Sequence, residues 1–321
     1  MTIPERKPEL SDHFDGARFT NPGETAGQPW RLLPRLLAEQ LRWDRWPAMP
    51  PIPTRRPAPR GDAAAAITFI GHSTFLIQTA AGNVLTDPVY SSHAGPFGRL
   101  GPKRHRAPAV AFENLPRVSV IVLSHNHYDH CDLPTLRRLA ERDDPLVVTA
   151  LGNARVLRRL GFSRIEELDW WERSTSSDIP IAATPARHFS SRTALDRNRA
   201  LWCGFMIGAA GLQIYFAGDS AYTALFREIP ERLGRVDLGL IPIGAYEPRW
   251  FMNVVHMNPA EAVRAHSDVK AARSIGMHFG TFQLTAEAID APLDGLKAAS
   301  NAAGLYAGEF TTLGFGETLM L

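Results

Sequence analysis

Residues 118–130, VSVIVLSHNHYDH, join an apolar run to a cluster of polar side chains, and this stretch decides the fold. The run Val118 to Leu123 is rich in β-branched residues, which predicts a strand buried on both faces. After the cluster, Asp132 can cap a helix that has Pro134 in its first turn. The cluster is therefore expected on a strand-to-helix loop at the carboxyl end of a buried strand, where sheet proteins commonly place their chemistry.

The histidine spacing in this loop predicts two metal sites. In a near-extended turn alternate side chains point the same way, so His125 and His127 can share one cation while Asp129 and His130 turn toward a second. Neutral imidazole and carboxylate are ligands of zinc, at about 2.0–2.2 Å. A solvated polar loop without any ligand role is the alternative. Three histidines and an aspartate in so short a span argue against it.

The composition is that of a globular protein with one large or two smaller domains: 321 residues, 45% hydrophobic and 21% charged. The net charge of +2 is too balanced to indicate a nucleic-acid partner, and none is expected. Two cysteines, Cys131 and Cys203, exclude a disulfide framework and lack a zinc-finger spacing. The N-terminus lacks the apolar core of a signal peptide, so a cytoplasmic location is expected.

The apolar stretch from Leu201 to Gly218 is long enough to suggest a membrane span. The segment GAAG at residues 208–211 divides it into two strand-length halves, so we expect a hairpin instead. Peripheral contact with a membrane surface stays compatible with the sequence.

Residues 1–60 are expected to form an N-terminal extension that ends in a Pro-rich connector at residues 47–53, and a single domain is expected over residues 61–321. Within the extension, residues 34–46 predict a short amphipathic helix with leucines beside arginines. Such a helix could lie on lipid. Packing of its apolar side chains against the main domain is the favoured alternative.

A β-meander is expected from Ala66 to Thr86. Asp87, at the end of its last strand, is either a turn residue or a carboxylate that orients a metal-bound imidazole. His72 lies in one of the meander's turns and is expected to be a structural histidine instead of a ligand.

Two further loops carry candidate substrate-binding residues. Lys103 and Arg104 belong to a basic loop, which is either solvated or a receptor for phosphate. Tyr246 and Arg249 belong to the stretch GAYEPRW at residues 244–250, which is too rich in aromatic and charged residues for a mere connection.

Single acidic and histidine residues follow several later strands of the predicted sheet. His188 could supply the third imidazole that a metal bound by His125 and His127 needs, and His278 also follows a strand. Asp219 follows Gly218 and could bridge two cations, which a shared carboxylate holds about 3.5–4 Å apart. His256 lies in a loop just before a helix.

These residues resemble the motifs of the metallo-β-lactamase superfamily: the H-x-H-x-D-H loop, a downstream histidine, a bridging aspartate and a final histidine. The resemblance implies an α/β fold, the αββα sandwich, and makes residues 61–321 a metallo-β-lactamase-like hydrolase domain. It is closer to one branch, the N-acylphosphatidylethanolamine-hydrolysing phospholipases D. Residues 101–104, 123–130, 168–172, 216–219, 241–252 and 278–282 carry this second resemblance.

The resemblance implies two zinc ions, with iron or manganese as alternatives. One ion would be held by His125, His127 and His188, and the other by Asp129, His130 and His278. Asp219 would lie between the ions and His256 beside them. Two positions depart from the branch: Val255 replaces a polar residue and Leu133 replaces a tyrosine, and both are expected to face substrate.

The expected reaction is in-line attack of water on a phosphodiester, with Asp129 and His256 as catalytic residues. His256 is the candidate general acid, because an imidazole with a pKa near 6.5 can give up a proton at neutral pH; the alternative is that it only hydrogen-bonds its loop. The expected substrate is an N-acylated ethanolamine phospholipid, and the partners left open are a membrane surface and a second copy in a homodimer. A cytosolic hydrolase of a soluble phosphodiester, ester or lactone and an iron redox protein are the other functions considered.

Overall fold

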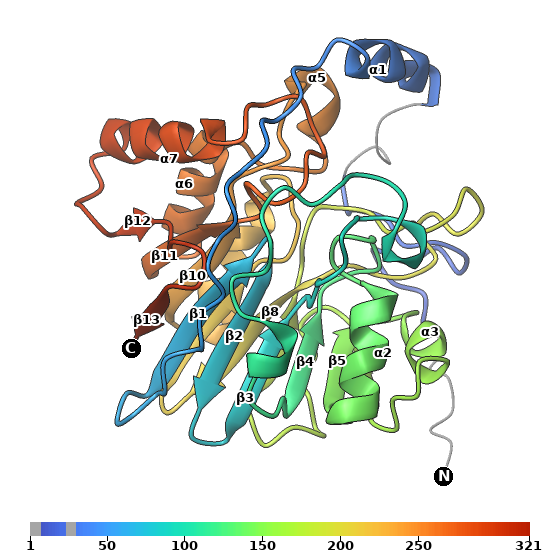
Figure 1. The fold of residues 1–321 in the computed structure, drawn as a ribbon. Helices are drawn as coiled ribbons and strands as arrows, with labels where there is room; N and C mark the ends of the chain where they lie inside the picture. The colour runs from blue at the N-terminus through green and yellow to red at the C-terminus, as the bar shows by residue number, and fades with distance from the viewer. Residues whose placement is uncertain (1–7, 24–29) are drawn as a thin grey trace.

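The computed structural model describes residues 8–23 and 30–321, and Figure 1 shows two β-sheets packed face to face with helices on their outer sides. The larger sheet has the strand order β13-β1-β2-β3-β4-β5-β6, and the smaller one has the order β12-β11-β10-β9-β8-β7. The larger sheet comprises β1 Ala65–Gly71, β2 Thr74–Thr79, β3 Gly82–Thr86, β4 Val120–Leu123, β5 Leu146–Ala150, β6 Ile165–Leu168 and β13 Thr318–Met320. The smaller sheet comprises β7 Ile181–Thr184, β8 Gly204–Ala209, β9 Leu212–Phe216, β10 Val236–Pro242, β11 Ala271–Met277 and β12 Phe310–Thr311.

The helices lie outside this sandwich. The α-helices are α1 Leu33–Gln40, α2 Leu133–Arg142, α3 Ala154–Arg158, α4 Glu228–Leu233, α5 Arg249–Met252, α6 Pro259–Asp268 and α7 Ala291–Ala302. Short 3-10 turns are η1 Trp30–Leu32, η2 Pro96–Gly98, η3 Phe112–Asn114 and η4 Ala224–Arg227. In Figure 1, α2 and α3 flank the β4–β5 side of the larger sheet, while α6 and α7 lie on the β10–β12 side of the smaller one.

The predicted central strand is buried on both faces, as its apolar run requires. Val120 and Val122 pack into the core that the two sheets share. Ile121 and Leu123 belong to the cluster under α2, which also contains Leu136. This alternation gives helix, sheet, sheet and helix in successive layers, so the αββα sandwich is confirmed.

The strand directions bring distant loops to one rim of the sandwich. In the larger sheet β3, β4 and β5 are parallel, and β1 shares their direction because β2 is antiparallel to both β1 and β3. In the smaller sheet β9, β10 and β11 are parallel, and β7 shares their direction in the same way. Since the carboxyl ends of parallel strands meet at one edge, the loops after these strands converge.

The expected meander is observed as β1–β3, and the hairpin expected over residues 201–218 is observed as β8–β9. No helix in residues 8–23 and 30–321 has the length and apolar character that a membrane crossing requires.

The helix expected over residues 34–46 is observed in a shorter form, since α1 begins at Leu33 and ends at Gln40. Beyond it the chain is held on the main domain by Gln283, whose amide accepts from the Trp46 backbone N–H and donates to the Asp44 carbonyl. The indole of Trp46 is buried and donates to the Glu287 carbonyl at 2.7 Å. The tryptophan therefore packs on the domain, although Leu37 and Leu41 of the same segment are exposed.

The described part of the N-terminal extension also packs on the domain. Phe19 is fully buried in the main core. His13 stacks on Trp170 and bonds Asp169 at 2.7 Å. Asn21 donates to the backbone carbonyl of His188 at 2.9 Å, which ties this segment to a residue of the candidate site.

Candidate metal centre

The loop between β4 and α2 is held in a tight turn that gathers its side chains. The backbone N–H groups of His130 and Cys131 both donate to the His127 carbonyl, at 3.2 and 2.7 Å. Arg192 braces the turn from outside, donating from Nη1 to the carbonyls of Asn126 and Cys131 at 2.8 Å each. The loop therefore presents its histidines from a fixed frame.

The first group of candidate ligands consists of His125, His127 and His188. Nδ1 of His127 lies 2.8 Å from Nε2 of His125 and 3.2 Å from Nε2 of His188. The remote nitrogen of His188 faces the Val255 carbonyl at 2.9 Å. Such a contact fixes the ring orientation and the tautomer.

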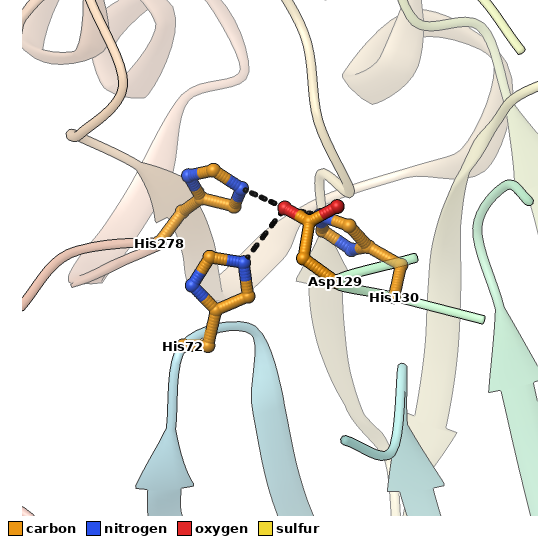
Figure 2. Close-up of side chains that lie close together, drawn as sticks. All are labelled: His72, Asp129, His130 and His278. Atoms are coloured by element: carbon orange, nitrogen blue, oxygen red, sulfur yellow. Dashed lines mark hydrogen bonds and ion pairs between the residues drawn. The ribbon is translucent and has the colours of Figure 1, made fainter. Parts of the chain in front are cut away.

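The second group consists of Asp129, His130, His278 and His72, and Figure 2 shows the Asp129 carboxylate pointing among the three rings. Oδ2 of Asp129 lies 3.4 Å from Nε2 of His278 and 3.5 Å from Nε2 of His130. Nε2 of His72 is closer still to the same oxygen, at 3.0 Å.

His72 was expected to be only structural, and the structure places it within this group. Its ring lies against that of His278, with 4.1 Å between the centroids. The sequence signal that could have revealed it is that His72 follows a buried strand. His125, His188, Asp219 and His278 likewise lie in the loops that follow buried strands.

Asp219 lies between the two groups. Its Oδ2 is 3.1 Å from Nε2 of both His130 and His278. The same oxygen is 3.8 Å from Nε2 of His188, and it is 4.0 Å from Nε2 of His125. All seven residues expected as metal ligands are thus brought together, with this carboxylate at the position expected of a bridge.

Asp87 supports the centre from behind. Its Oδ2 lies 2.7 Å from Nδ1 of His130 and accepts from the Ser124 hydroxyl, while its Oδ1 accepts from the Ser124 backbone N–H at 2.7 Å. Of the two roles considered for Asp87, these contacts favour the one that orients an imidazole.

Three of these residues have left-handed backbone conformations. The φ angles are 57° for His72, 61° for His278 and 31° for Asp87. Residues with side chains rarely adopt such angles, and in folded proteins they gather at functional sites. The surrounding fold therefore holds these residues in place against their local preference.

The electrostatics of the two groups differ. Burial lowers the pKa of His125 well below its ordinary value, that of His127 to about 3 and that of His188 to about 4. Burial acts on His278 in the same direction, but the carboxylates of Asp219 and Asp129 outweigh it and raise its pKa to about 9. The first group is therefore neutral at pH 7, as metal ligation requires, whereas His130 and His278 of the second group hold protons in the metal-free chain.

The unpaired atoms of the cluster test whether cations fit there. Nε2 of His130 and of His278 and Oδ1 of Asp219 are buried and make no aligned hydrogen bond, although the two nitrogens are within ion-pair distance of Asp219. Buried polar atoms without partners are costly. Imidazoles and carboxylates in this arrangement fit a binuclear metal site, in which cations would engage these atoms.

His256 also lies at the centre, with Nε2 4.0 Å from Oδ2 of Asp219. Burial holds its pKa well below 6.5, so the expectation of an ordinary pKa is wrong and the ring is neutral at pH 7. Its Nδ1 is buried without a hydrogen-bond partner in the described part of the chain, so the structure does not favour a role confined to bracing its own loop.

The four expected substrate-binding residues lie in different settings. Arg104 donates to the carbonyls of Ser91 and Val89 at 2.9 Å each, which favours a structural role over the expected substrate contact. Arg249 pairs with Glu261 at 2.8 Å and donates to the His256 carbonyl at 3.0 Å, so it positions the His256 loop. Lys103 is exposed and Tyr246 is half-buried.

Residues 82–279 match the family described as the beta-lactamase superfamily domain. The chain belongs to the metallo-β-lactamase superfamily. This metallo-β-lactamase-fold chain is similar in structure to Igni18, a metallo hydrolase of the archaeon Ignicoccus hospitalis, with a TM-score of 0.60 and 21% identity over 80% of this chain and 98% of that one.

Two relatives in sequence are more similar. An uncharacterised protein of Mycobacterium tuberculosis is 39% identical over 278 residues, which are 84% of this metallo-β-lactamase-fold chain and 72% of the relative. The N-acyl-phosphatidylethanolamine-hydrolyzing phospholipase D 1 of Caenorhabditis elegans is 37% identical over 263 residues, 78% of this chain and 74% of the nematode protein. A metal-dependent hydrolase is the activity that the family and the His/Asp cluster together support.

Proposed function

We propose that the protein is a binuclear zinc phosphodiesterase of phospholipase D type. Its substrates are N-acylphosphatidylethanolamine-like phospholipids, which it hydrolyses to an N-acylethanolamine and a phosphatidic acid. The similarity to the nematode phospholipase D over 78% of this chain carries the proposal. The gathered ligand set supports it, since paired cations suit the two non-bridging oxygens of a phosphodiester.

Two divalent cations bound by the two histidine groups would lower the pKa of water and neutralise charge that develops on the phosphate. Asp219 holds the groups together and balances their charge. The Asp129 side chain is 13% exposed, the most open of the acidic groups here. Burial would raise the pKa of this carboxyl, but the charge of His130 outweighs burial and holds the pKa well below its ordinary value. We assign it to orient the attacking water as an ionised hydrogen-bond acceptor.

His256 is assigned to the leaving ethanolamine oxygen. Because the ring is neutral at pH 7, it acts there by donating a hydrogen bond instead of passing on a proton from an imidazolium. We expect His256→Ala to lower kcat about 100-fold with metal content unchanged. Loss of metal from this variant would show that His256 is a ligand.

The proposal is tested by hydrolysis of N-acylphosphatidylethanolamine beside a soluble phosphodiester, bis(p-nitrophenyl) phosphate, in water enriched in oxygen-18. The P–O bond to the ethanolamine should break, so the label should enter the phosphatidic acid and be absent from the N-acylethanolamine. Turnover of the soluble diester without turnover of the lipid would favour the alternative hydrolase. Label in a carboxylate product would indicate attack at an ester.

A further inference from the structure

A groove of about 1100 Å³ lies beside the metal centre. Its walls come from α2, α3 and the loops that follow β3 and β7, and it shares Asn126 and Tyr128 with the H-x-H-x-D-H loop. Leu133, one of the departures from the phospholipase branch, lies in the same wall.

The groove is strongly cationic. Six arginines line it, and they are Arg99, Arg137, Arg155, Arg159, Arg192 and Arg199. Its two acidic residues are both engaged by the chain itself. Asp132 accepts from Ser91 and from the Tyr90 backbone, and Asp196 accepts from the backbone N–H groups of Arg192 and Thr193. Six guanidinium groups against two carboxylates leave the groove with a net positive charge.

Five of these arginines are exposed and make no ion pair within residues 8–23 and 30–321. The sixth, Arg192, is half-buried and donates to backbone carbonyls of the metal loop. Some arginines elsewhere on the surface have carboxylate partners, as Arg138 does with Glu113 and Arg232 does with Glu228. Like charges held together without counter-charges repel one another, so this arrangement favours an anionic ligand.

Two buried amides point to what that ligand carries. Asn126 is 8% exposed and Asn153 is 1% exposed, and both line the groove. Their Oδ1 atoms have no hydrogen-bond partner in the described structure. An anion that also carries hydroxyl donors would satisfy both oxygens.

The groove has an apolar rim. Phe97 lines it, is 81% exposed, and is held in the left-handed region at a φ of 59°. Leu100 and Leu195, neighbours of groove residues in the chain, are 57% and 79% exposed. Exposed aromatic and aliphatic groups beside a cationic patch are typical of a surface that enters the interface of a membrane.

We propose that this groove binds the headgroup of an anionic phospholipid at a membrane surface. The arginines engage the lipid phosphate, Asn126 and Asn153 accept from headgroup hydroxyls, and Phe97 enters the acyl boundary. The proposal deepens the proposed function, because it would bring the metal centre to the surface where a phospholipid substrate lies. Binding of a lipid headgroup in the groove does not require turnover, so the groove proposal and the proposed function can fail independently.

Vesicle flotation tests the proposal with full-length protein. Vesicles of phosphatidylcholine alone are compared with vesicles that also contain phosphatidylglycerol, whose headgroup carries both the anion and the hydroxyls. We expect binding to the second kind, weakening with ionic strength. The double variant Arg155→Ala, Arg159→Ala should bind about 10–30-fold more weakly, at about 1 kcal/mol for each basic residue near an anionic surface.

The matched control is Arg117→Ala with Arg235→Ala. Both arginines are exposed, and both precede strands, β4 and β10, at the opposite edge of the sandwich. Phe97→Gly is a second probe that relieves a left-handed conformation, so it should fold and still lose binding.

Three outcomes overturn the proposal. The first is equal binding to both kinds of vesicle, and the second is equal loss in the groove and control variants. The third is release of the protein from vesicles by millimolar inorganic phosphate at constant ionic strength, which would assign the groove to a free phosphate. Vesicle binding without hydrolysis of N-acyl phospholipid would leave the groove assignment standing and contradict the proposed function alone.

Discussion

Asp219 is the residue on which the two histidine groups converge, since its Oδ2 lies within 4.0 Å of a nitrogen from each of five imidazoles. Burial would raise its pKa, but His130 and His278 outweigh burial and hold it well below the ordinary value. The carboxylate is thus ionised and ready to neutralise cations. An amide at this position would keep the shape and lose the charge.

We therefore expect Asp219→Asn to abolish turnover and to lower the bound metal from two ions per chain. His125→Ala should also abolish turnover. Metal analysis by mass spectrometry of the purified variants checks this, with Asp294→Asn on the exposed face of α7 as the control. Full metal content in Asp219→Asn would contradict the bridging assignment.

His72 offers a separate test of the second group. Its Nε2 contacts Asp129 at 3.0 Å, so replacing it removes either a partner of that carboxylate or a ligand. We expect His72→Ala to lower the affinity of the second group for its cation about 10–100-fold, as loss of a supporting contact does. Competition titration with a chelator measures this. Unchanged affinity would return His72 to the purely structural role first expected.

At the scale of elements, the close approach of β9's end to the β4 loop decides the site's geometry. Gly218 has a φ of 60°, and a Cβ there would lie 2.8 Å from the Cys203 carbonyl oxygen and 2.9 Å from Cβ of Ser124. The residue directly before Asp219 must therefore be glycine. A methyl group at this position would push the Asp219 loop away from His125.

Gly218→Ala should thus lower metal affinity and activity together, and it should cost about 1–3 kcal/mol of stability from strain alone. Denaturant unfolding and metal titration measure the two effects. Gly211→Ala, in the β8–β9 turn where a Cβ meets nothing within 4 Å, is the control for backbone strain without crowding. Normal metal affinity in Gly218→Ala would contradict the close-approach argument.

The elements themselves could largely be predicted from the sequence. Val118 to Leu123 alternates between two cores, and Gly208 to Gly211 turns a hairpin, so local pattern and fold agree there. Residues 41–46 were expected to continue α1, but the chain turns at residues 41–43 and Gln283 then holds the backbone of Asp44 and Trp46. Contacts between segments far apart in sequence are not visible in a hydrophobic pattern.

The sequence predicts which residues form the site better than it predicts the role of each residue. The seven ligand candidates share a position after strands that are parallel, so their convergence follows from topology. The pKa of His256 could not be foreseen, because burial and not residue type decides it. Arg104 and Arg249 were assigned to substrate, but backbone carbonyls and Glu261 engage them.

At the scale of the whole molecule, the N-terminal segment stabilises the fold around the site. His13 bonds both Asp169 and Asp12, and these contacts outweigh burial and raise its pKa above 6.5. A histidine with a raised pKa contributes stability that is present in full below pH 6.5. That contribution is lost as the pH rises through the folded-state pKa.

We expect the free energy of unfolding to fall as the pH is raised above 6.5 and this dependence to weaken in His13→Asn. Thermal unfolding at several pH values measures it, in metal-free protein so that ligand titration is the same in both. His93→Asn, in the loop between β3 and β4, is the control substitution. An identical pH profile in His13→Asn would contradict the assignment.

The central claim is that two cations lie on either side of Asp219. Anomalous X-ray diffraction from crystals of protein purified without chelator and supplied with zinc, collected at the zinc edge, tests it most directly. The account predicts two peaks per chain, one among His125, His127 and His188 and one among Asp129, His130 and His278. A single peak, or peaks away from these residues, would contradict it.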